Sequence, residues 1–193
     1  MKFAAAAASF VALAGVASAS VASVTELVER DASELCSYGT AGLQGQMAFV
    51  YPLFESCKSA LNGNFANPWS NSACVAAAIV GSPGLVRDSL SCDSADIPAT
   101  SSLPYLDYGV YADIVGSCAY ASTACGITQQ NFVDFIYTQI GDEASATWPS
   151  DSGLLVSTYI TPLMDWTATG SSIPYANFND WLHYAPDDVL EDC

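Results

Sequence analysis

The cysteines constrain the fold of this chain more than any other residue type. Seven cysteines occur in 193 residues, and one of them is the last residue, Cys193. An odd number leaves one thiol without a partner inside the chain, so Cys193 is the candidate for a free thiol or an intermolecular bridge. The other six can close on themselves as three structural disulfides whose connectivity stays open: Cys36, Cys57, Cys74, Cys92, Cys118 and Cys125.

The spacing of Cys118 and Cys125 allows two interpretations. In one continuous helix they would lie two turns apart, about 10 Å, which is too far for a disulfide. A helix break at Ser122-Thr123 would let them pair. The sequence contains no Cys-x-x-Cys motif, which argues against a zinc ribbon or a thioredoxin-type redox site.

The N-terminus has the pattern of a secretory signal peptide. After a short basic start, an apolar run covers 4–16, and Ala17-Ser18-Ala19 is the small-x-small sequence that signal peptidase cuts. The run is shorter than the roughly 20 residues of a membrane span. We therefore expect residues 1–19 to be a signal peptide and the protein to be secreted and extracellular. Residues 20–35 are then either a pro-segment, cut after Arg30, or an N-terminal helix.

The charge of the chain excludes several kinds of partner. It carries 20 acidic and 4 basic residues, for a formal net charge of −16. Nucleic acids and anionic membranes attract clustered lysine and arginine side chains, so we expect neither as a partner. Only 12% of the residues are charged whereas 51% are hydrophobic, so the chain can bury a core.

Apolar residues recur at the helical period along most of the chain, which predicts an all-α fold. Between Leu43 and Leu61 they step by three or four, and Pro52 is expected to kink or restart that helix. Residues 154–160 suit either a strand or a short kinked helix, and we favour the helix. Further helices are predicted over 74–80, 106–118 with Pro104 in the first turn, 129–140 and 174–184. Thr128 and Ser172 are the predicted N-caps of the last two, and Ser82 is predicted to cap a further short helix that starts at Pro83.

A weak internal repeat indicates helical hairpins. Residues 127–136 align with 173–182, so that Phe132 matches Phe178 and Asp134 matches Asp180. A true repeat would bury both phenylalanines in equivalent places and leave both aspartates in solvent, although two ordinary amphipathic helices would share some of these matches. We expect a single domain over residues 36–186, an array of short helices stapled by disulfides with repeated helical hairpins as one option, and an acidic C-terminal tail at 187–193.

Few residues suggest chemistry. The only histidine is His183, so no multi-histidine copper or zinc centre can form within the chain, and we predict no metal or other cofactor. A Ser-His-Asp triad would also need a nucleophile elbow, Gly-x-Ser-x-Gly, which is missing, so a surface or packed histidine is preferred. Paired carboxylates can hydrolyse glycosides, although the simpler interpretation places these candidates on the polar sides of helices: Asp107, Asp113, Asp134, Asp165 and Asp180.

The four tryptophans divide into two pairs. Trp69 and Trp148 fall in predicted loops beside prolines, so they are candidates for an exposed interface or a sugar-stacking surface, with packing against the protein as the equal alternative. Trp166 and Trp181 fall on the faces of the repeat and are expected in the core. An apolar tunnel between helices that carries a lipid or sterol is a further option.

The overall profile resembles the small non-catalytic subunits that accompany certain secreted laccases of basidiomycete fungi. It rests on the alanine-rich leader Met1–Ala19, the acidic chain, the cysteines Cys36 to Cys125 and the lack of a metal-ligand set, while no Asn-x-Ser/Thr glycosylation site is present. The resemblance implies an accessory protein without its own active site that stabilises a larger copper oxidase. The alternatives are a small secreted hydrolase of cell-wall glycans using paired aspartates, and a lectin-like or lipid-binding carrier.

Overall fold

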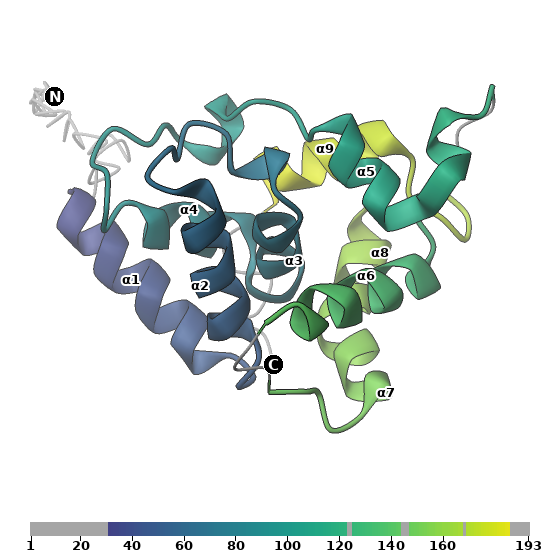
Figure 1. Ribbon diagram of the computed structural model, residues 1–193, viewed down its shortest axis with the longest axis horizontal. Helices are drawn as coiled ribbons and strands as arrows, with labels where there is room; N and C mark the ends of the chain where they lie inside the picture. The colour runs from purple at the N-terminus through teal and green to yellow at the C-terminus, as the bar shows by residue number, and fades with distance from the viewer. Residues whose placement is uncertain (1–30, 123–124, 144–146, 168, 186–193) are drawn as a thin grey trace, which may run out of the picture.

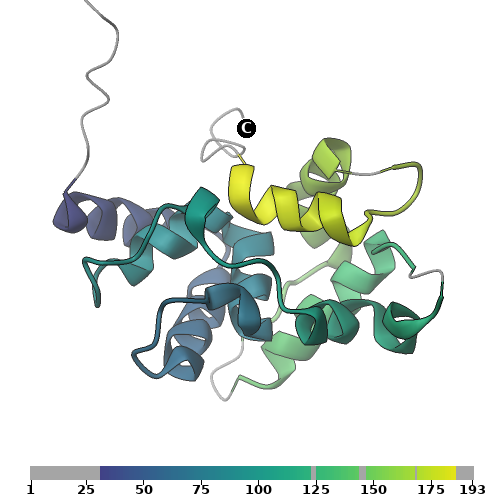
Figure 2. The same cartoon turned by 90° about the horizontal axis from the view of Figure 1, so that it is seen from above.

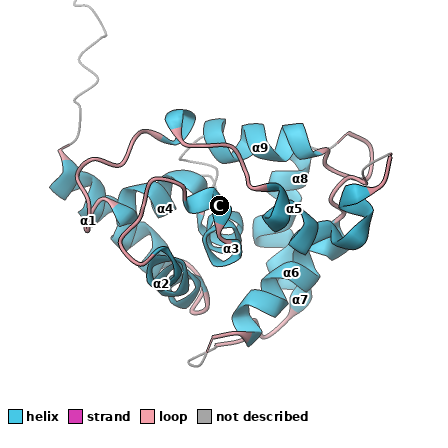
Figure 3. Ribbon diagram, turned by 45° about the horizontal axis from the view of Figure 1, so that its top comes forward, coloured by secondary structure: helices cyan, strands magenta, loops and turns pink. Residues whose placement is uncertain are grey.

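The computed structural model describes residues 31–122, 125–143, 147–167 and 169–185. Within these ranges the chain is all-α, with isolated β-bridges and no strand (Figure 3). The predicted fold class is therefore confirmed. The α-helices are α1 (Ala32–Gly45), α2 (Val50–Leu61), α3 (Ser72–Gly81), α4 (Pro83–Leu90), α5 (Tyr108–Val115), α6 (Gln129–Gly141), α7 (Ser152–Leu155), α8 (Thr161–Thr167) and α9 (Tyr175–Tyr184). Three short 3-10 helices and one π-helical turn join them: η1 (Pro68–Ser70), η2 (Thr100–Ser102), η3 (Gly116–Tyr120) and the π-turn η4 (Val156–Ile160).

Several predictions fall on other parts of the chain. The signal peptide at 1–19, the cleavage point at Arg30, the acidic tail from 187 onward and Cys193 lie outside the described residues. The helical domain begins slightly before residue 36, because α1 starts at Ala32. The side chain of Asp31 caps this helix by accepting the backbone N–H groups of Ser33 at 2.8 Å and Glu34 at 2.9 Å.

Helix α3 forms the centre of the fold. Every residue from Cys74 to Gly81 is buried, as expected for a helix that is apolar on all sides. The N-terminal helices α1, α2 and α4 lie on one side of α3, and α5, α6 and α8 lie on the other (Figures 1 and 3). Seen from above, the same division separates the purple and blue helices from the green and yellow ones (Figure 2).

Three disulfides staple this array within its first two thirds. Cys36–Cys92 ties α1 to the end of α4, Cys57–Cys74 ties α2 to α3, and Cys118–Cys125 closes the segment between η3 and α6. The Cα atoms of Cys118 and Cys125 lie 5.7 Å apart because α5 ends before them. The helix breaks at Gly116, whose φ of 76° ends α5, and not at Ser122-Thr123.

Some helix boundaries differ from the prediction. The helix expected from Leu43 to Leu61 is two helices, since α1 ends at Gly45 and α2 begins at Val50. Pro52 therefore stands in the first turn of α2, where a missing backbone N–H costs no helical hydrogen bond. The break falls at residues 46–49, which contain no proline.

Two of the three predicted N-caps are confirmed and one is wrong. Ser82 and Thr128 cap α4 and α6 as expected, each accepting a backbone N–H with its hydroxyl oxygen. Ser172 does not cap α9, because Pro174 is the residue that precedes this helix. Pro104 lies before α5 rather than in its first turn, since α5 begins at Tyr108. Residues 154–160 are helical, as favoured, and run from α7 through the π-turn η4.

Residues matched by the internal repeat contact one another in the structure. Ile127 and Ile173 exchange two backbone hydrogen bonds, each 2.8 Å long, and the rings of Phe132 and Phe178 meet edge to face at 5.4 Å. Both phenylalanines are fully buried, whereas the matched aspartates, Asp134 and Asp180, are both exposed. Contacts between equivalent residues are the pattern that a two-fold relation generates. Hairpin α5–α6 therefore packs against hairpin α8–α9 through matched positions.

Candidate interaction surface

The two tryptophans proposed for an interface have different environments. Trp69 is fully buried, so the interface interpretation is wrong for this residue and the packing alternative holds. Pro68 starts the turn η1, and the backbone carbonyl of Trp69 accepts the N–H of Asp107 at 3.1 Å, which fixes the turn against the start of α5. Trp148 is half exposed, at 50%, and stacks on Tyr137 at 5.7 Å.

The other two tryptophans also differ from each other. Trp181 is buried on α9, as predicted, and stacks on Phe178 at 5.7 Å. Trp166 was expected in the core but is 46% exposed on α8. At the offset of 46 residues that relates the two halves of the repeat, Trp166 corresponds to Tyr120, which is exposed as well, at 70%. The repeat thus places an outward aromatic, and not a core residue, at this position.

Tyrosines form the main aromatic surface of the described structure. We call this surface the tyrosine face, and it consists of Tyr105, Tyr108, Tyr120 and Tyr175 on and around α5 and α9. Tyr105 and Tyr120 are 74% and 70% exposed, and Tyr108 is 39% exposed. The ring of Tyr108 lies 5.7 Å from that of Tyr120 and 5.4 Å from that of Tyr175. The rings of Tyr108, Tyr120 and Tyr175 therefore form one cluster, whereas the ring of Tyr105 contacts that of His183 on α9.

Hydroxyl groups hold two rings of the tyrosine face in place. The hydroxyl of Tyr108 donates to the carbonyl of Ala119 at 2.6 Å, and the hydroxyl of Tyr175 donates to the carbonyl of Leu106 at 2.5 Å. The hydroxyl of the buried Tyr111 donates to the backbone carbonyl of Cys125, which belongs to the third disulfide. Rings fixed in this way lose little conformational entropy when a partner packs on them.

One side of α9 anchors the segment that carries Tyr105. Tyr175, Asn179 and His183 are four residues apart, so they share one helix face. In addition to the Tyr175 bond, the N–H of Leu106 donates to the Oδ1 atom of Asn179 at 2.9 Å, and His183 Nε2 lies 2.9 Å from the carbonyl oxygen of Leu103. Three side chains of α9 thus bind the backbone of the extended segment before α5.

His183 has a packing role. It is 4% exposed, and its second ring nitrogen, Nδ1, lies 2.6 Å from the carbonyl oxygen of Asn179. Both ring nitrogens are therefore occupied by backbone carbonyl groups, which leaves neither one for a serine or an aspartate. The ring also meets Tyr105 edge to face at 5.6 Å. The packed histidine is the interpretation that this geometry supports.

A polar groove lies beside α5. It has a volume of about 470 Å³, and of the five candidate aspartates it contains Asp107 and Asp113. Asp107 Oδ1 accepts the N–H of Gly109 at 2.7 Å and caps α5, while Asp113 Oδ2 accepts the hydroxyl of Ser72 at 2.8 Å. We call it the acidic groove, and its polar lining consists of Ser70, Asn71, Ser72, Asp107, Asp113 and Gln139.

Asp107 links the groove to the tyrosine face electrostatically. Burial raises the pKa of Tyr175, and the negative charge of Asp107 raises it further. Burial also raises the pKa of Tyr111, with a smaller contribution from Tyr108.

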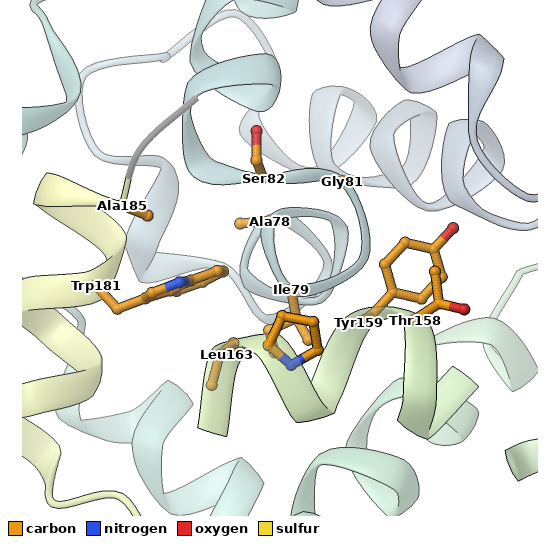
Figure 4. A pocket seen from close by; sticks show the side chains of 10 residues that line it. Ala78, Ile79, Gly81, Ser82, Thr158, Tyr159, Leu163, Trp181 and Ala185 are labelled. Carbon is orange, nitrogen blue, oxygen red and sulfur yellow. The ribbon is translucent and has the colours of Figure 1, made fainter. Parts of the chain in front are cut away.

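A second pocket is apolar and small (Figure 4). Side chains from α3, η4, α8 and α9 converge on it, among them Ile79, Tyr159 and Trp181. Its volume is about 30 Å³, whereas pockets for drug-sized ligands span roughly 300–1,000 Å³. It has no room for a lipid or sterol.

Sequence reasoning missed the tyrosine face although a signal was present. Four of the ten tyrosines fall between residues 105 and 120, at a spacing that is not helical throughout and so is not explained by one buried helix side. The stripe of Tyr175, Asn179 and His183 was visible too, because polar side chains four residues apart lie on one face of a helix and need partners if that face is buried.

The described ranges contain no group of three or more His, Cys, Asp or Glu side chains that could hold a metal ion. In the same ranges no single helix is long and apolar enough to span a membrane, and α3 and α4 meet that condition only as a pair bent by 119°. No protein-family model matches the chain, and comparisons with curated proteins and with solved structures also gave no match.

Proposed function

We propose that the chain is a secreted, non-catalytic interaction protein that binds a larger extracellular protein through the tyrosine face. The observation that carries the proposal is the exposure of Tyr105, Tyr108 and Tyr120, together with the hydrogen bond that holds the ring of Tyr108. Tyrosine is enriched among the residues that dominate binding energy at protein interfaces, since its large ring has few rotatable bonds. An exposed cluster of this kind is typical of a binding surface.

Two observations support an extracellular location. Three disulfides indicate an oxidising compartment, because cytosolic thiols are kept reduced. The leader at residues 1–19 has the pattern of a cleaved signal peptide. We propose on these grounds that the protein acts outside the cell.

The first partner to test is a secreted copper oxidase. This choice follows from the resemblance to laccase small subunits, which supports an accessory role in which the partner holds the copper. An acidic chain with a single histidine fits that division of labour. The accessory protein would stabilise the oxidase by binding its folded form.

Glycan hydrolysis is the second candidate, favoured by Asp107 and Asp113 in one groove. A glycosidase needs one carboxyl group that stays protonated to act as the acid, which usually requires an apolar site shielded from water. Both aspartates are exposed and accept hydrogen bonds. This chemistry is therefore the weaker proposal.

Native purification from culture fluid tests the proposal. We expect the protein to elute with a larger partner, and a blue colour in that fraction would identify a copper oxidase. The double variant Tyr105→Ala/Tyr120→Ala should release the partner, whereas Tyr38→Ala on α1, which removes a 37% exposed tyrosine elsewhere, should not. A monomer that releases sugar from cell-wall glycan would refute the proposal in favour of the hydrolase.

A further inference from the structure

A third pocket is built from other elements than the tyrosine face. It has a volume of about 400 Å³ and lies between α1, α2 and the end of α4, the helices grouped at the left of Figure 1. This volume is within the roughly 300–1,000 Å³ of pockets that hold small molecules. We call this pocket the N-terminal groove. No residue of the tyrosine face is among the described residues that line it.

A disulfide holds two walls of the N-terminal groove together. Cys36 and Thr40 are four residues apart on α1, and Ser89 and Cys92 are three apart at the end of α4, so each pair shares one helix face. The Cys36–Cys92 disulfide joins these faces, and the Thr40 hydroxyl lies 3.5 Å from the Sγ atom of Cys92. All four residues line the groove. The position of Ser89 opposite α1 is therefore fixed by a covalent bond.

The hydroxyl group of Ser89 points to a ligand. Ser89 is 1% exposed, and its Oγ atom has no hydrogen-bond partner within the described part of the chain. A helical serine often donates to a carbonyl of the preceding turn, as Ser91 does to that of Asp88 at 2.6 Å. A buried hydroxyl without a partner costs free energy. A ligand that hydrogen bonds to Ser89 in the groove would remove this cost.

The rest of the lining determines the chemistry of such a ligand. Tyr51 and Phe54 on α2 supply apolar ring surface, with their ring centroids 6.0 Å apart. The ammonium group of Lys58 is paired with Asp93 at 2.8 Å, and Glu55 adds a carboxylate to the lining. Anions are therefore repelled by two carboxylates, while the ammonium group repels cations. A neutral ligand that has both an apolar face and hydroxyl groups fits this lining.

We infer that the N-terminal groove binds a neutral sugar. A pyranose ring carries hydroxyl groups that donate and accept hydrogen bonds, and a face of C–H groups that packs on an aromatic ring. Ser89 and Thr40 supply hydroxyl partners, and Tyr51 supplies the ring. We expect binding without hydrolysis, because Glu55 is the one carboxylate among the described lining residues and glycoside hydrolysis needs two. The inference does not depend on the partner proposed for the tyrosine face.

Titration of the disulfide-bonded protein with three neutral disaccharides, followed by ligand-observed NMR, tests the inference. The probes are cellobiose, laminaribiose and mannobiose, and sorbitol is the control because it has hydroxyl groups without a ring. We expect at least one disaccharide to bind, and sorbitol to bind about 3- to 10-fold more weakly, which is the contribution of one ring contact. Failure of all three disaccharides to bind, or equal binding of sorbitol, would overturn the inference.

Ser89→Ala separates a ligand contact from a structural role. It removes a hydroxyl that has no partner in the protein, so thermal unfolding should show an unchanged or higher Tm, whereas sugar binding should weaken about 3- to 10-fold. Ser59→Ala is the matched control, because Ser59 is exposed on the same helix as Tyr51 but does not line the groove. It should change binding less than about twofold. Sugar binding that Ser89→Ala leaves unchanged would refute the site.

Tyr51 provides a second, independent variant. Tyr51→Ala should weaken sugar binding about tenfold, and Tyr51→Phe, which keeps the ring, about threefold or less. Normal far-ultraviolet circular dichroism of both variants shows that the fold is retained. Equal binding by Tyr51→Ala and the unchanged protein would contradict the stacking role.

Two results distinguish this inference from the proposed function. Tyr105→Ala/Tyr120→Ala should leave sugar binding unchanged, and loss of the sugar in this variant would place it on the tyrosine face and overturn the groove assignment. Ser89→Ala should still elute with the native partner. If no partner elutes with the unchanged protein, the proposed function fails, while disaccharide binding that depends on Ser89 still supports the sugar site.

Discussion

Replacing Gly39 by alanine tests the closest helix contact in the fold. Gly39 lies within α1, and an added Cβ atom would stand 2.5 Å from the backbone nitrogen of Ser89 and 2.8 Å from the carbonyl carbon of Asp88 on α4. Both neighbours are backbone atoms, which cannot rotate away as a side chain would. The Cys36–Cys92 disulfide, about one turn away, also limits how far α1 can move.

Two opposing effects decide the magnitude. Alanine in place of glycine stabilises a helix interior by about 1 kcal/mol. Overpacking a close contact costs about 1–3 kcal/mol, and backbone contacts lie at the upper end because they require a helix shift. We therefore expect Gly39→Ala to lower the free energy of unfolding by about 1–2 kcal/mol, a decrease in Tm of about 2–8 °C for a domain of this size.

Urea unfolding followed by far-ultraviolet circular dichroism, without reductant, measures this change. Gly45→Ala is the matched control in the same helix, because no atom lies within 4 Å of its added Cβ, and it should leave stability unchanged or slightly raised. Gly42→Ala should fall between them, since its Cβ meets the flexible side chain of Leu85. If Gly39→Ala proves as stable as Gly45→Ala, α1 and α4 do not pack as closely as described.

The remaining predictions concern bonds distributed through the fold. Asn179→Ala should destabilise the protein by about 1–3 kcal/mol, because the buried N–H of Leu106 loses its acceptor, and thermal unfolding should show a lower Tm. Asp107→Asn should lower the pKa of Tyr175, visible in the alkaline ultraviolet difference spectrum. Burial raises the pKa values of Tyr111 and Tyr159 in the folded state. The free energy of unfolding should therefore be constant below about pH 10, the pKa of tyrosine in the unfolded chain, and should fall as the pH rises through the folded pKa values. A rise in stability over that range would contradict the burial of these hydroxyl groups. Pairwise Cys→Ser removal of the disulfides should cost about 4, 3 and 2 kcal/mol by loop length, in the order Cys36–Cys92, Cys57–Cys74, Cys118–Cys125, whose separations are 56, 17 and 7 residues.

Periodicity predicted the helical fold because its signal is local. The apolar run of α3 and the spacing of apolar residues by three and four in α6 can both be read from short windows of sequence. The break between α1 and α2 could not be located in this way, since the spacing from Leu43 to Val50 stays helical across it. The prediction placed the break at Pro52, yet a proline is compatible with the first turn of a helix.

The environment of single aromatic residues depends on tertiary contacts that a sequence does not display. Trp69 has loop-like neighbours, but its turn is fastened to the start of α5 and its ring is buried. Trp166 and Trp181 share the same apparent periodicity and differ in exposure. The repeat correctly predicted the burial of Phe132 and Phe178, because these two residues occupy matched positions and contact each other.

The stripe on α9 has a consequence for the order in which the molecule is made. The bonds from Tyr175, Asn179 and His183 to the segment before α5 span 69 to 80 residues of chain. Synthesis proceeds from the N-terminus, so residues 103–106 emerge long before the helix that holds them. A nascent chain therefore contains all six cysteines of the three disulfides before it contains the residues that anchor this segment. A partner that recognises the tyrosine face would select completed molecules.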